Sequence, residues 1–259
     1  MNQFLKIALI QTDIVWQNAE ENRKLYLEKI NLITEQIDLI VLPEMFTTGF
    51  SMHPHNIAEY MYGDTVKWMQ KITSEKNTAI SGSLIISENN KFYNRFIFVH
   101  PSGKIEFYNK RHLFSLAGEH TVYVSGDEKI IIDYKGWKIC PQVCYDLRFP
   151  VYARNVEGYD LLLYVANWPK VRISAWDALL KARSIENLCY TIGVNRVGVD
   201  ASNYEYNGHS AAYDCLGKQI VEAKNNKEDV VIVTLDKNQV SKVRNSLDFL
   251  NDRDNFEIK

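Results

Sequence analysis

The sequence predicts an α/β fold in which helices cover β-sheets. Two apolar runs of strand length, Asp38 to Leu42 (DLIVL) and Asp160 to Val165 (DLLLYV), are typical of strands buried on both faces. Segments with helical spacing of apolar residues alternate with such strands. We find no internal repeat, low-complexity tract or Gly/Ser linker, so we expect one domain over residues 1–259, with a core at about 4–235 and a C-terminal helix and tail at 236–259.

The first half of the chain alternates strand and helix patterns. In order, we expect a strand at 4–12, a helix carrying Tyr26, Ile30, Ile33 and Ile37, the strand at 38–42, a helix at 65–76, a strand at 79–87, and a hairpin of 92–99 with 104–108. The hairpin turns at Pro101-Ser102-Gly103, whose composition is typical of a turn. Lys110 therefore follows a hairpin arm.

The second half begins with another expected hairpin, which turns at Lys135-Gly136. Its arms are expected at 130–134 and 137–143, and a helix that opens at 148–150 and is closed by Gly158 follows. Next we expect strands at 160–165 and 190–195, with a helix at 174–187 between them. The chain then continues with a hairpin turning at 216–218, a final strand VVIVTL and a polar C-terminal helix. This order of strands and helices predicts sheets that are covered by outer layers of helices.

Charge and hydropathy exclude some classes of function. The chain has 30 Lys and Arg against 32 Asp and Glu, a formal charge of -2, and no sustained basic run. Nucleic acid is therefore not expected as the main partner, because phosphate binding depends on clustered cations. A small uncharged or weakly anionic ligand fits better. We expect no membrane segment and no signal peptide, since no run of ~18 apolar residues occurs, and we therefore expect a cytoplasmic protein.

Four cysteines are few for this length, and they form no CxxC pair. We expect reduced thiols and no metal. Cys140 and Cys144 leave open a thiol-redox or metal-binding protein, as an alternative of another class. Residues four apart on an extended strand lie ~13 Å from end to end, which is too far for a disulfide.

The most informative stretch is Ile139 to Pro150 (ICPQVCYDLRFP), because it places Cys144 at the end of an apolar strand and directly before a helix. Such a turn exposes a side chain and directs helix N-terminal N–H groups toward its target, and the local field favours the nucleophilic thiolate. The alternative is a small buried apolar cysteine. Asp146 and Arg148 are expected to brace this turn without touching substrate.

Glu44 follows the strand DLIVL, and Lys110 follows a hairpin arm. With Cys144 they make chemical sense as a hydrolytic triad. Cys144 attacks an amide carbonyl, Lys110 and the Tyr145 backbone N–H stabilise the oxyanion, and Glu44 carries protons. A Cys-His pair is the alternative arrangement, with its base drawn from three histidines. They are His112, His120 and His209.

These three motifs resemble the nitrilase superfamily of carbon-nitrogen hydrolases, whose Glu-Lys-Cys triad appears in the same order. The matching segments are LPEMFTTGF, NKRHLF and CYDLRFP, and the resemblance runs from residue 6 to about 235. It implies a four-layer α-β-β-α sandwich and a cofactor-free reaction through a cysteine thioester. It also implies a homodimer packed through the helices after Cys144 and after ANWP, in which Trp176 and Leu180 serve the partner as well as the core.

CYDLRFP, GEH, ANWP and RISAWDALLKARSIEN are similar to the omega-amidase branch. Bacterial omega-amidases hydrolyse 2-oxoglutaramate and 2-oxosuccinamate to 2-oxo acids and ammonia, which makes 2-oxo acid amides the implied substrates. The resemblance also implies that Glu119 holds the lysine or the substrate. Cys140-Pro141-Gln142 and Asp214-Cys215 depart from the family pattern without touching the triad. An aliphatic amidase, a carbamoylase or a nitrilase remains the enzymatic alternative.

Substrate-binding residues are expected beside these motifs. Arg172 is a candidate for a terminal carboxylate, because a guanidinium grips a carboxylate through two hydrogen bonds, although a helix-entrance ion pair is an equal interpretation. Asn167, after the strand DLLLYV, is expected to line the cavity. Phe46, Phe50 and Trp168 are candidates for its walls, or for the core.

Overall fold

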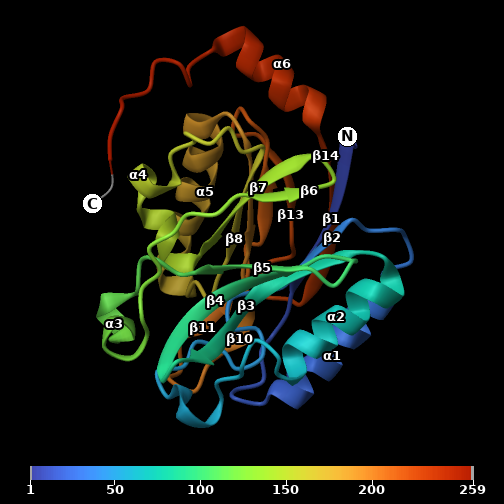
Figure 1. Cartoon of the computed structure of the whole chain (residues 1–259), viewed down its shortest axis with the longest axis vertical. Helices are drawn as coiled ribbons and strands as arrows, with labels where there is room; N and C mark the ends of the chain where they lie inside the picture. Colours follow the sequence, from blue (N-terminus) through green and yellow to red (C-terminus); the bar gives the residue numbers. More distant parts are fainter. Residues whose placement is uncertain (1, 258–259) are drawn as a thin grey trace.

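Two six-stranded sheets pack face to face between outer layers of helices in the computed structural model, which describes residues 2–257 (Figure 1). The first sheet has the order β14-β1-β2-β3-β4-β5. Its strands are β1 (Phe4–Gln11), β2 (Leu39–Val41), β3 (Ala79–Glu88), β4 (Lys91–Val99), β5 (Ile105–Asn109) and β14 (Asp229–Asp236). The second sheet has the order β13-β12-β9-β8-β7-β6. Its strands are β6 (Ile132–Tyr134), β7 (Trp137–Val143), β8 (Leu161–Val165), β9 (Tyr190–Val194), β12 (Ala211–Tyr213) and β13 (Gln219–Glu222).

Helices occupy the outer layers and the chain's connections. The α-helices are α1 (Ala19–Asn31), α2 (Asp64–Lys76), α3 (Glu119–Val122), α4 (Pro150–Ala153), α5 (Ile173–Asn187) and α6 (Lys237–Leu247). The 3-10 helices are η1 (Pro54–Asn56), η2 (Ser115–Ala117), η3 (Cys144–Arg148) and η4 (Lys170–Arg172). Asn18 begins α1, because its side chain accepts a hydrogen bond from the Glu21 backbone N–H (3.1 Å).

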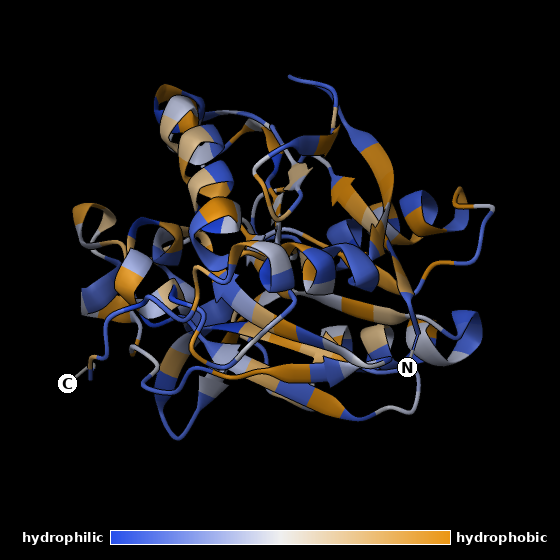
Figure 2. Cartoon of the chain, turned by 90° about the horizontal axis from the view of Figure 1, so that it is seen from above, coloured by the Kyte–Doolittle hydropathy of each residue, from blue (hydrophilic) through white to orange (hydrophobic). Residues whose placement is uncertain are grey.

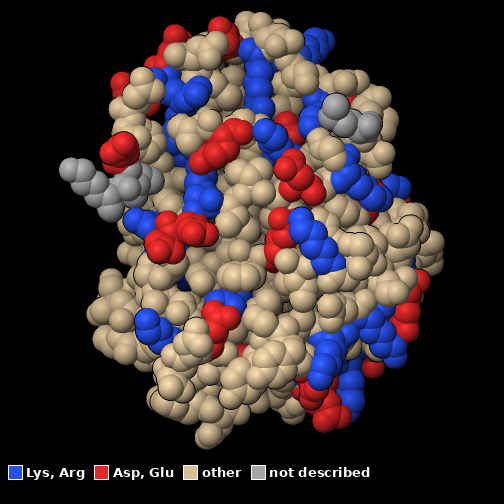
Figure 3. Space-filling view, viewed as in Figure 1, with Lys and Arg blue, Asp and Glu red and all other residues tan. Residues whose placement is uncertain are grey.

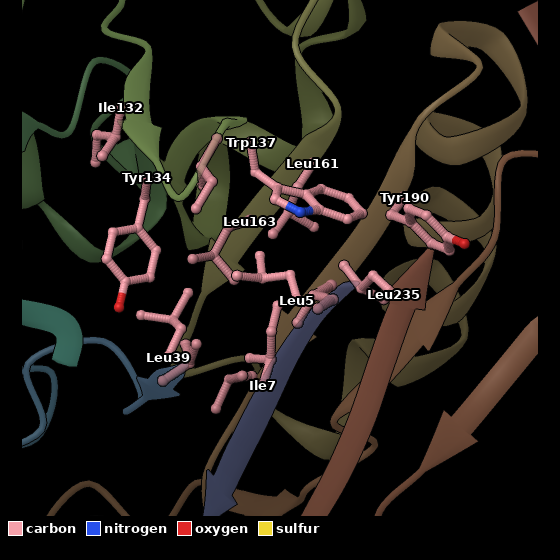
Figure 4. Close-up of a cluster of buried hydrophobic side chains, with 14 of the residues drawn as sticks. Leu5, Ile7, Leu39, Ile132, Tyr134, Trp137, Leu161, Leu163, Tyr190 and Leu235 are labelled. Atoms are coloured by element: carbon pink, nitrogen blue, oxygen red, sulfur yellow. The ribbon is translucent and has the colours of Figure 1, made fainter. Parts of the chain in front are cut away.

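The central core lies between the sheets. Figure 4 shows Leu5 and Ile7 of β1 facing side chains of the second sheet such as Leu161 and Leu163 of β8, all of them fully buried. Alternate residues of the same strands point outward: Ile40 packs with α1 and α2, and Leu162 packs with α5. This alternation confirms the four-layer sandwich and explains why the strand sequences are continuously apolar.

Parallel pairing sets the position of the site. β7, β8 and β9 run parallel, with Val143 beside Val165 and Val165 beside Val194. β1, β2 and β3 are likewise parallel. Carboxyl ends of parallel strands meet at one edge of a sheet, where α/β proteins place their ligands. Glu44 follows β2, Cys144 follows β7 and Asn167 follows β8, so the fold brings three segments distant in sequence to one place.

Most expected elements form, and three expectations are wrong. The first helix ends at Asn31, so Ile33 and Ile37 lie beyond it. The helix that follows Pro150 ends at Ala153 rather than at Gly158, because Arg154 has an extended ψ of 132°. A third, two-stranded sheet of β10 (Val197–Val199) and β11 (Glu205–Asn207) was not expected. The tail expected at 236–259 contains α6, and its residues 258–259 lie outside the described part.

Trp176 and Leu180, expected to serve a partner subunit, are fully buried within the chain. Both pack over Gly193 of β9, whose missing side chain makes room for them. They belong to the core beneath α5, so their size is explained without a second copy. α5 therefore turns its other side outward.

Polar and apolar residues separate as the layers require. Figure 2 shows hydrophobic strand segments at the centre and helices with one hydrophobic and one hydrophilic side. On the face in Figure 3, Lys and Arg are interspersed with Asp and Glu. Between residues 2 and 257, no helix combines the length and the hydropathy needed to cross a bilayer.

Candidate active site

The three side chains expected to act in catalysis all line one cavity of about 370 Å³. Glu44 enters from the loop after β2, Lys110 from the residue after β5, and Cys144 from the end of β7. Aromatic residues form much of the wall, including Trp16 and Phe50. The cavity lies between the two sheets' loops, so neither sheet alone could form it.

Glu44 is fully buried, and each of its carboxylate oxygens has donors. Oε1 accepts hydrogen bonds from Lys110 Nζ (3.0 Å) and Asn94 Nδ2 (2.7 Å), and Oε2 accepts one from the Asn167 backbone N–H (2.8 Å). Asn167 Nδ2 also donates to the Glu44 carbonyl (2.6 Å). These contacts tie the loop after β2 to the loop after β8, across the two sheets.

Lys110 lies between two carboxylates. Its Nζ is 3.0 Å from Glu44 Oε1 and 2.8 Å from Glu119 Oε2, and its side chain is buried. Burial alone would lower the pKa of Lys110, but the carboxylates of Glu119 and Glu44 outweigh it and raise that pKa above its ordinary value. Lys110 is therefore an ammonium that can stabilise negative charge in the cavity.

Glu119 begins the short helix α3 and is buried, although in isolation its polar sequence context indicates a solvated side chain. Its Oε2 accepts a hydrogen bond from the Phe114 N–H (2.5 Å) besides its contact with Lys110. Burial raises the pKa of Glu119, and Lys110 opposes that rise. The geometry matches the lysine-holding position that the resemblance implies.

Cys144 adopts a left-handed backbone conformation with φ of 46°, and η3 begins at this residue. A non-glycine residue held at positive φ is strained, and such turns present nucleophiles at strand ends. Its Sγ lies 3.9 Å from the Asn167 carbonyl. The turn expected from the sequence therefore forms, with Tyr145, the expected oxyanion donor, as its next residue and also in the cavity wall.

The expected preference for thiolate is wrong for this structure. Burial, followed by the Glu44 carboxylate, raises the pKa of Cys144 well above its ordinary value, and Lys110 only partly opposes them. Five residues of 3-10 helix provide too little dipole to reverse these effects. The resting group is a thiol, which must lose its proton to a base during attack.

The histidines expected as alternative bases have other partners. His112 Nδ1 lies 2.7 Å from Asp146 Oδ1 and its ring stacks on Phe149, while His209 lies 3.1 Å from Asp177. His120 is exposed on α3. The residues described as lining the cavity include none of these three. A fourth histidine, His53, does line the cavity, together with Glu44, which is the base expected from the sequence.

Asp146 braces the turn as expected. Its carboxylate accepts hydrogen bonds from the Val143 and His112 backbone N–H groups and from the Tyr108 hydroxyl (2.8–3.0 Å). Arg148 differs from expectation, because it lines the cavity and its guanidinium lies 4.9 Å from the centre of the Trp168 ring. The backbone of η3 directs Arg148 to the cavity mouth and Asp146 into the protein.

The expected substrate-binding residues divide between cavity and core. Asn167, Trp168 and Arg172 line the cavity, and the Arg172 guanidinium lies 5.3 Å from the Phe114 ring centre. Phe46 is wrong as a wall residue: it is fully buried between the first sheet and its helices, with its ring 5.4 Å from that of Tyr26. Glu44 and Phe46 lie on opposite sides of the turn after β2, and Phe50 lines the cavity instead.

Sequence reasoning missed two parts of the site. Asn94 of β4 donates to both Glu44 Oε1 (2.7 Å) and Glu119 Oε1 (3.2 Å), but nothing in FYNRF distinguishes it from any polar strand residue. The β10–β11 hairpin supplies another part of the wall through Asp200, Ser202, Tyr204 and Tyr206. Alternating tyrosines in NYEYN are the available signal for that hairpin.

Cys140 and Cys144 are free thiols, and Cys140 is buried in β7 with its pKa raised to about 12 by burial. Across residues 2–257, no three His, Cys, Asp or Glu side chains are grouped so that they could hold a metal ion. The two cysteines therefore occupy different environments, one in the core beneath α5 and one at the cavity.

The fold is that of the nitrilase superfamily. A crystal structure of XC1258 from Xanthomonas campestris, described as a CN-hydrolase superfamily protein with an arsenic adduct in the active site, has a TM-score of 0.97 and 41% identity, with all of both chains covered. Yeast Nit3 shares the fold alone, with a TM-score of 0.84 at 23% identity over 95% of each chain.

The chain belongs to the carbon-nitrogen hydrolase family, whose model matches residues 6–245. It is 40% identical to the omega-amidase YafV of Escherichia coli K12, over 98% of both chains. It is also 31% identical to the 2-oxoglutaramate amidase of Bacillus subtilis, over 95% of this chain and 96% of that one.

Proposed function

We propose that this enzyme is an omega-amidase, which hydrolyses the terminal amide of 2-oxo acid amides such as 2-oxoglutaramate and 2-oxosuccinamate to the 2-oxo dicarboxylate and ammonia. The observation that carries the proposal is the grouping of the buried Glu44 and Lys110 with the half-buried Cys144 at one cavity. Relatives 40–45% identical that are named omega-amidase support the substrate class.

In the first half-reaction, the Cys144 thiol gives its proton to Glu44 as sulfur bonds to the amide carbon. The Lys110 ammonium and the Tyr145 backbone N–H stabilise the oxyanion, and one such donor typically contributes ~3 kcal/mol. The tetrahedral intermediate then breaks its C–N bond while Glu44 returns the proton to the leaving nitrogen. Ammonia departs, and a thioester to Cys144 remains.

In the second half-reaction, Glu44 takes a proton from water as the water oxygen bonds to the thioester carbon. Lys110 and the Tyr145 N–H again stabilise the oxyanion. The C–S bond breaks, and the Cys144 sulfur regains a proton from Glu44. The net change adds one water, releases ammonia and the carboxylic acid, and needs no redox partner. This cycle uses no cofactor.

The cationic mouth of the cavity, which we define as Arg148 and Arg172, supports a substrate with a carboxylate at its far end. Each guanidinium lies against an aromatic ring, Arg148 on Trp168 and Arg172 on Phe114, which limits its motion and leaves its N–H groups for an anion. No ion pair competes for either guanidinium among the described residues. A nitrile or simple monoamide would leave this charge unused.

We further propose that residues 1–259 form a single domain and that the enzyme works as a homodimer in the cytoplasm, with no nucleic-acid partner. Exposed apolar side chains on α4 and α5, Val151 and Ile185, support a contact between copies. A catalytic thiol is kept reduced in the cytoplasm. On the face in Figure 3, Lys and Arg are interspersed with Asp and Glu, which does not favour phosphate binding there.

An ammonia-release screen tests the proposed function. Purified enzyme is supplied with four substrate classes: 2-oxo acid amides, simple monoamides, carbamoyl amino acids and nitriles. We expect the highest kcat/KM for 2-oxoglutaramate or 2-oxosuccinamate. Higher kcat/KM for another class would replace the omega-amidase with that hydrolase, and the catalytic cluster would be unchanged.

A further inference from the structure

Asn94 lies behind Glu44, where it meets both buried carboxylates. Its side chain is 1% exposed, and its Nδ2 lies 2.7 Å from Glu44 Oε1 and 3.2 Å from Glu119 Oε1. The Lys110 backbone N–H also donates to the Asn94 carbonyl (2.9 Å). The neutral Asn94 side chain thus connects the two buried carboxylates, and its backbone pairs with that of Lys110.

A chain of hydrogen bonds fixes which end of the Asn94 amide faces the carboxylates. The Met45 backbone N–H lies 2.9 Å from Ser83 Oγ, and Ser83 Oγ lies 2.9 Å from Asn94 Oδ1. Ionised carboxylates can only accept, so the end of the Asn94 amide that faces Glu44 and Glu119 is Nδ2. Ser83 Oγ accepts from the Met45 N–H and gives its one proton to Asn94 Oδ1, which supports the same orientation. Met45 is the residue after Glu44, so the chain starts and ends at the Glu44 loop.

The donors on Glu44 are distributed unequally between its two oxygens. Oε1 accepts from Lys110 and Asn94, which uses both of its lone pairs in the carboxylate plane. Oε2 accepts from the Asn167 N–H and keeps one lone pair. The oxygen with room for a proton is therefore Oε2.

We propose that Asn94 is a positioning residue for the base Glu44, and that Ser83 sets its direction. Asn94 and Lys110 together fill Oε1, so the Cys144 proton can move only to Oε2. Because Asn94 is uncharged, it does so without adding a second cation to the cluster. This inference rests on the role of Glu44 in the proposed function.

Four titratable groups face Glu44 besides this chain. They are Lys110 after β5, Glu119 of α3, Cys144 at the start of η3 and the buried Tyr123, whose pKa is raised by its own burial and by Glu119. Asn94→Leu also removes the hydrogen bond to Glu119 Oε1, whereas Ser83→Ala removes no hydrogen bond to any of the four. A shift that appears in both variants can therefore be assigned to the amide donor.

Two substitutions and one matched control test the proposal. Asn94→Leu removes the donor at similar side-chain size, and Ser83→Ala removes only the group that orients the amide. Ser81→Ala is the control, since Ser81 is also buried on β3, two residues away on the same face, and its hydroxyl contacts only the Ile40 carbonyl (3.5 Å). We expect Asn94→Leu to lower kcat about tenfold or more, with KM unchanged within about twofold.

A purely structural role of Asn94 would not shift the pH dependence of the reaction, so this dependence is the deciding measurement. The acid limb of kcat/KM should move to higher pH in Asn94→Leu and, by less, in Ser83→Ala, but not in Ser81→Ala. The same displacement should appear in a ¹³C NMR titration of glutamate carboxyls, where the Glu44 resonance is the one lost in Glu44→Gln. This titration needs no substrate, so it decides the role of Asn94 even if the proposed amidase activity is absent.

Titration curves of Asn94→Leu that coincide with those of the native enzyme would overturn the proposal. If Asn94→Leu does not fold, Ser83→Ala decides, because it keeps every charged group. A Ser83→Ala profile that coincides with that of Ser81→Ala would then be the contradictory result. A loss of melting temperature alone, with both pH profiles unmoved, would also show that Asn94 is only structural.

Discussion

At the scale of single residues, the Cys144 thiol meets two opposing charges. Burial and the Glu44 carboxylate raise its pKa, while the Lys110 ammonium lowers it. Charge at Glu44 therefore makes the thiol less acidic, while in the proposed cycle Glu44 is also the base that removes its proton.

This balance predicts opposite effects for two substitutions. Glu44→Gln removes a negative charge and so lowers the pKa of Cys144, whereas Lys110→Met removes the positive charge and raises that pKa further. Rates of iodoacetamide alkylation at Cys144, measured against pH, should therefore move to lower pH in the first variant and to higher pH in the second. Displacement of both curves in the same direction would contradict the assigned charges.

The cationic mouth of Arg148 and Arg172 carries a prediction about substrate choice. Replacing either arginine by Ala should raise KM for 2-oxoglutaramate about 10- to 100-fold, since a hydrogen bond to a charged group contributes about 1.5–3 kcal/mol. A monoamide without a carboxylate is the control, and its KM should be unchanged. Unaltered 2-oxoglutaramate kinetics in both single variants would place the carboxylate elsewhere.

At the scale of elements, α5 depends on a glycine beneath it. A Cβ at Gly193 of β9 would lie 2.5 Å from Trp176 Cζ2 and 2.6 Å from Leu180 Cδ1. Gly193→Ala should reduce the free energy of unfolding by roughly 1–3 kcal/mol, the usual cost of overpacking. Thermal or denaturant unfolding measures this, and an unchanged midpoint would mean that α5 can shift freely.

Strands buried on both faces were predictable because their signal is local. DLIVL and DLLLYV bury alternate side chains in different layers, so their strands are visible as continuous apolar runs, although β2 itself has three residues. β10 and β11 were not predicted, since they have no such apolar run and are held by their pairing. α4 was overestimated because Pro150 indicates where a helix begins but not where it ends.

The candidate site likewise contains residues that the sequence predicts and residues that it does not. Glu44, Lys110 and Cys144 could be found because each directly follows a strand and carries a chemistry that the reaction needs. Glu119 came from the family resemblance alone. Asn94 and the β10–β11 hairpin could not be found, because their role depends on which strands neighbour each other in the sandwich. Phe46 failed for a related reason: one turn after β2 sends adjacent side chains to different layers.

At the scale of the whole molecule, α4 and α5 leave apolar side chains exposed on one helical layer. Ile185 of α5 is 45% exposed, and Val151 of α4 is 56% exposed. We expect Ile185→Asp to convert a homodimer to monomers in sedimentation velocity experiments. Leu32→Asp is the matched control, because Leu32 is exposed in the opposite helical layer. A native enzyme that sediments as a monomer at micromolar concentration would contradict the expected dimer.

Both half-reactions of the proposed cycle require the Cys144 sulfur. The most direct measurement is therefore ammonia release from 2-oxoglutaramate by Cys144→Ala. The variant should fold as the native enzyme does, judged by circular dichroism and melting temperature. Its ammonia release should fall by about three orders of magnitude or more, since the reaction loses its nucleophile. Undiminished release by the folded variant would contradict the account.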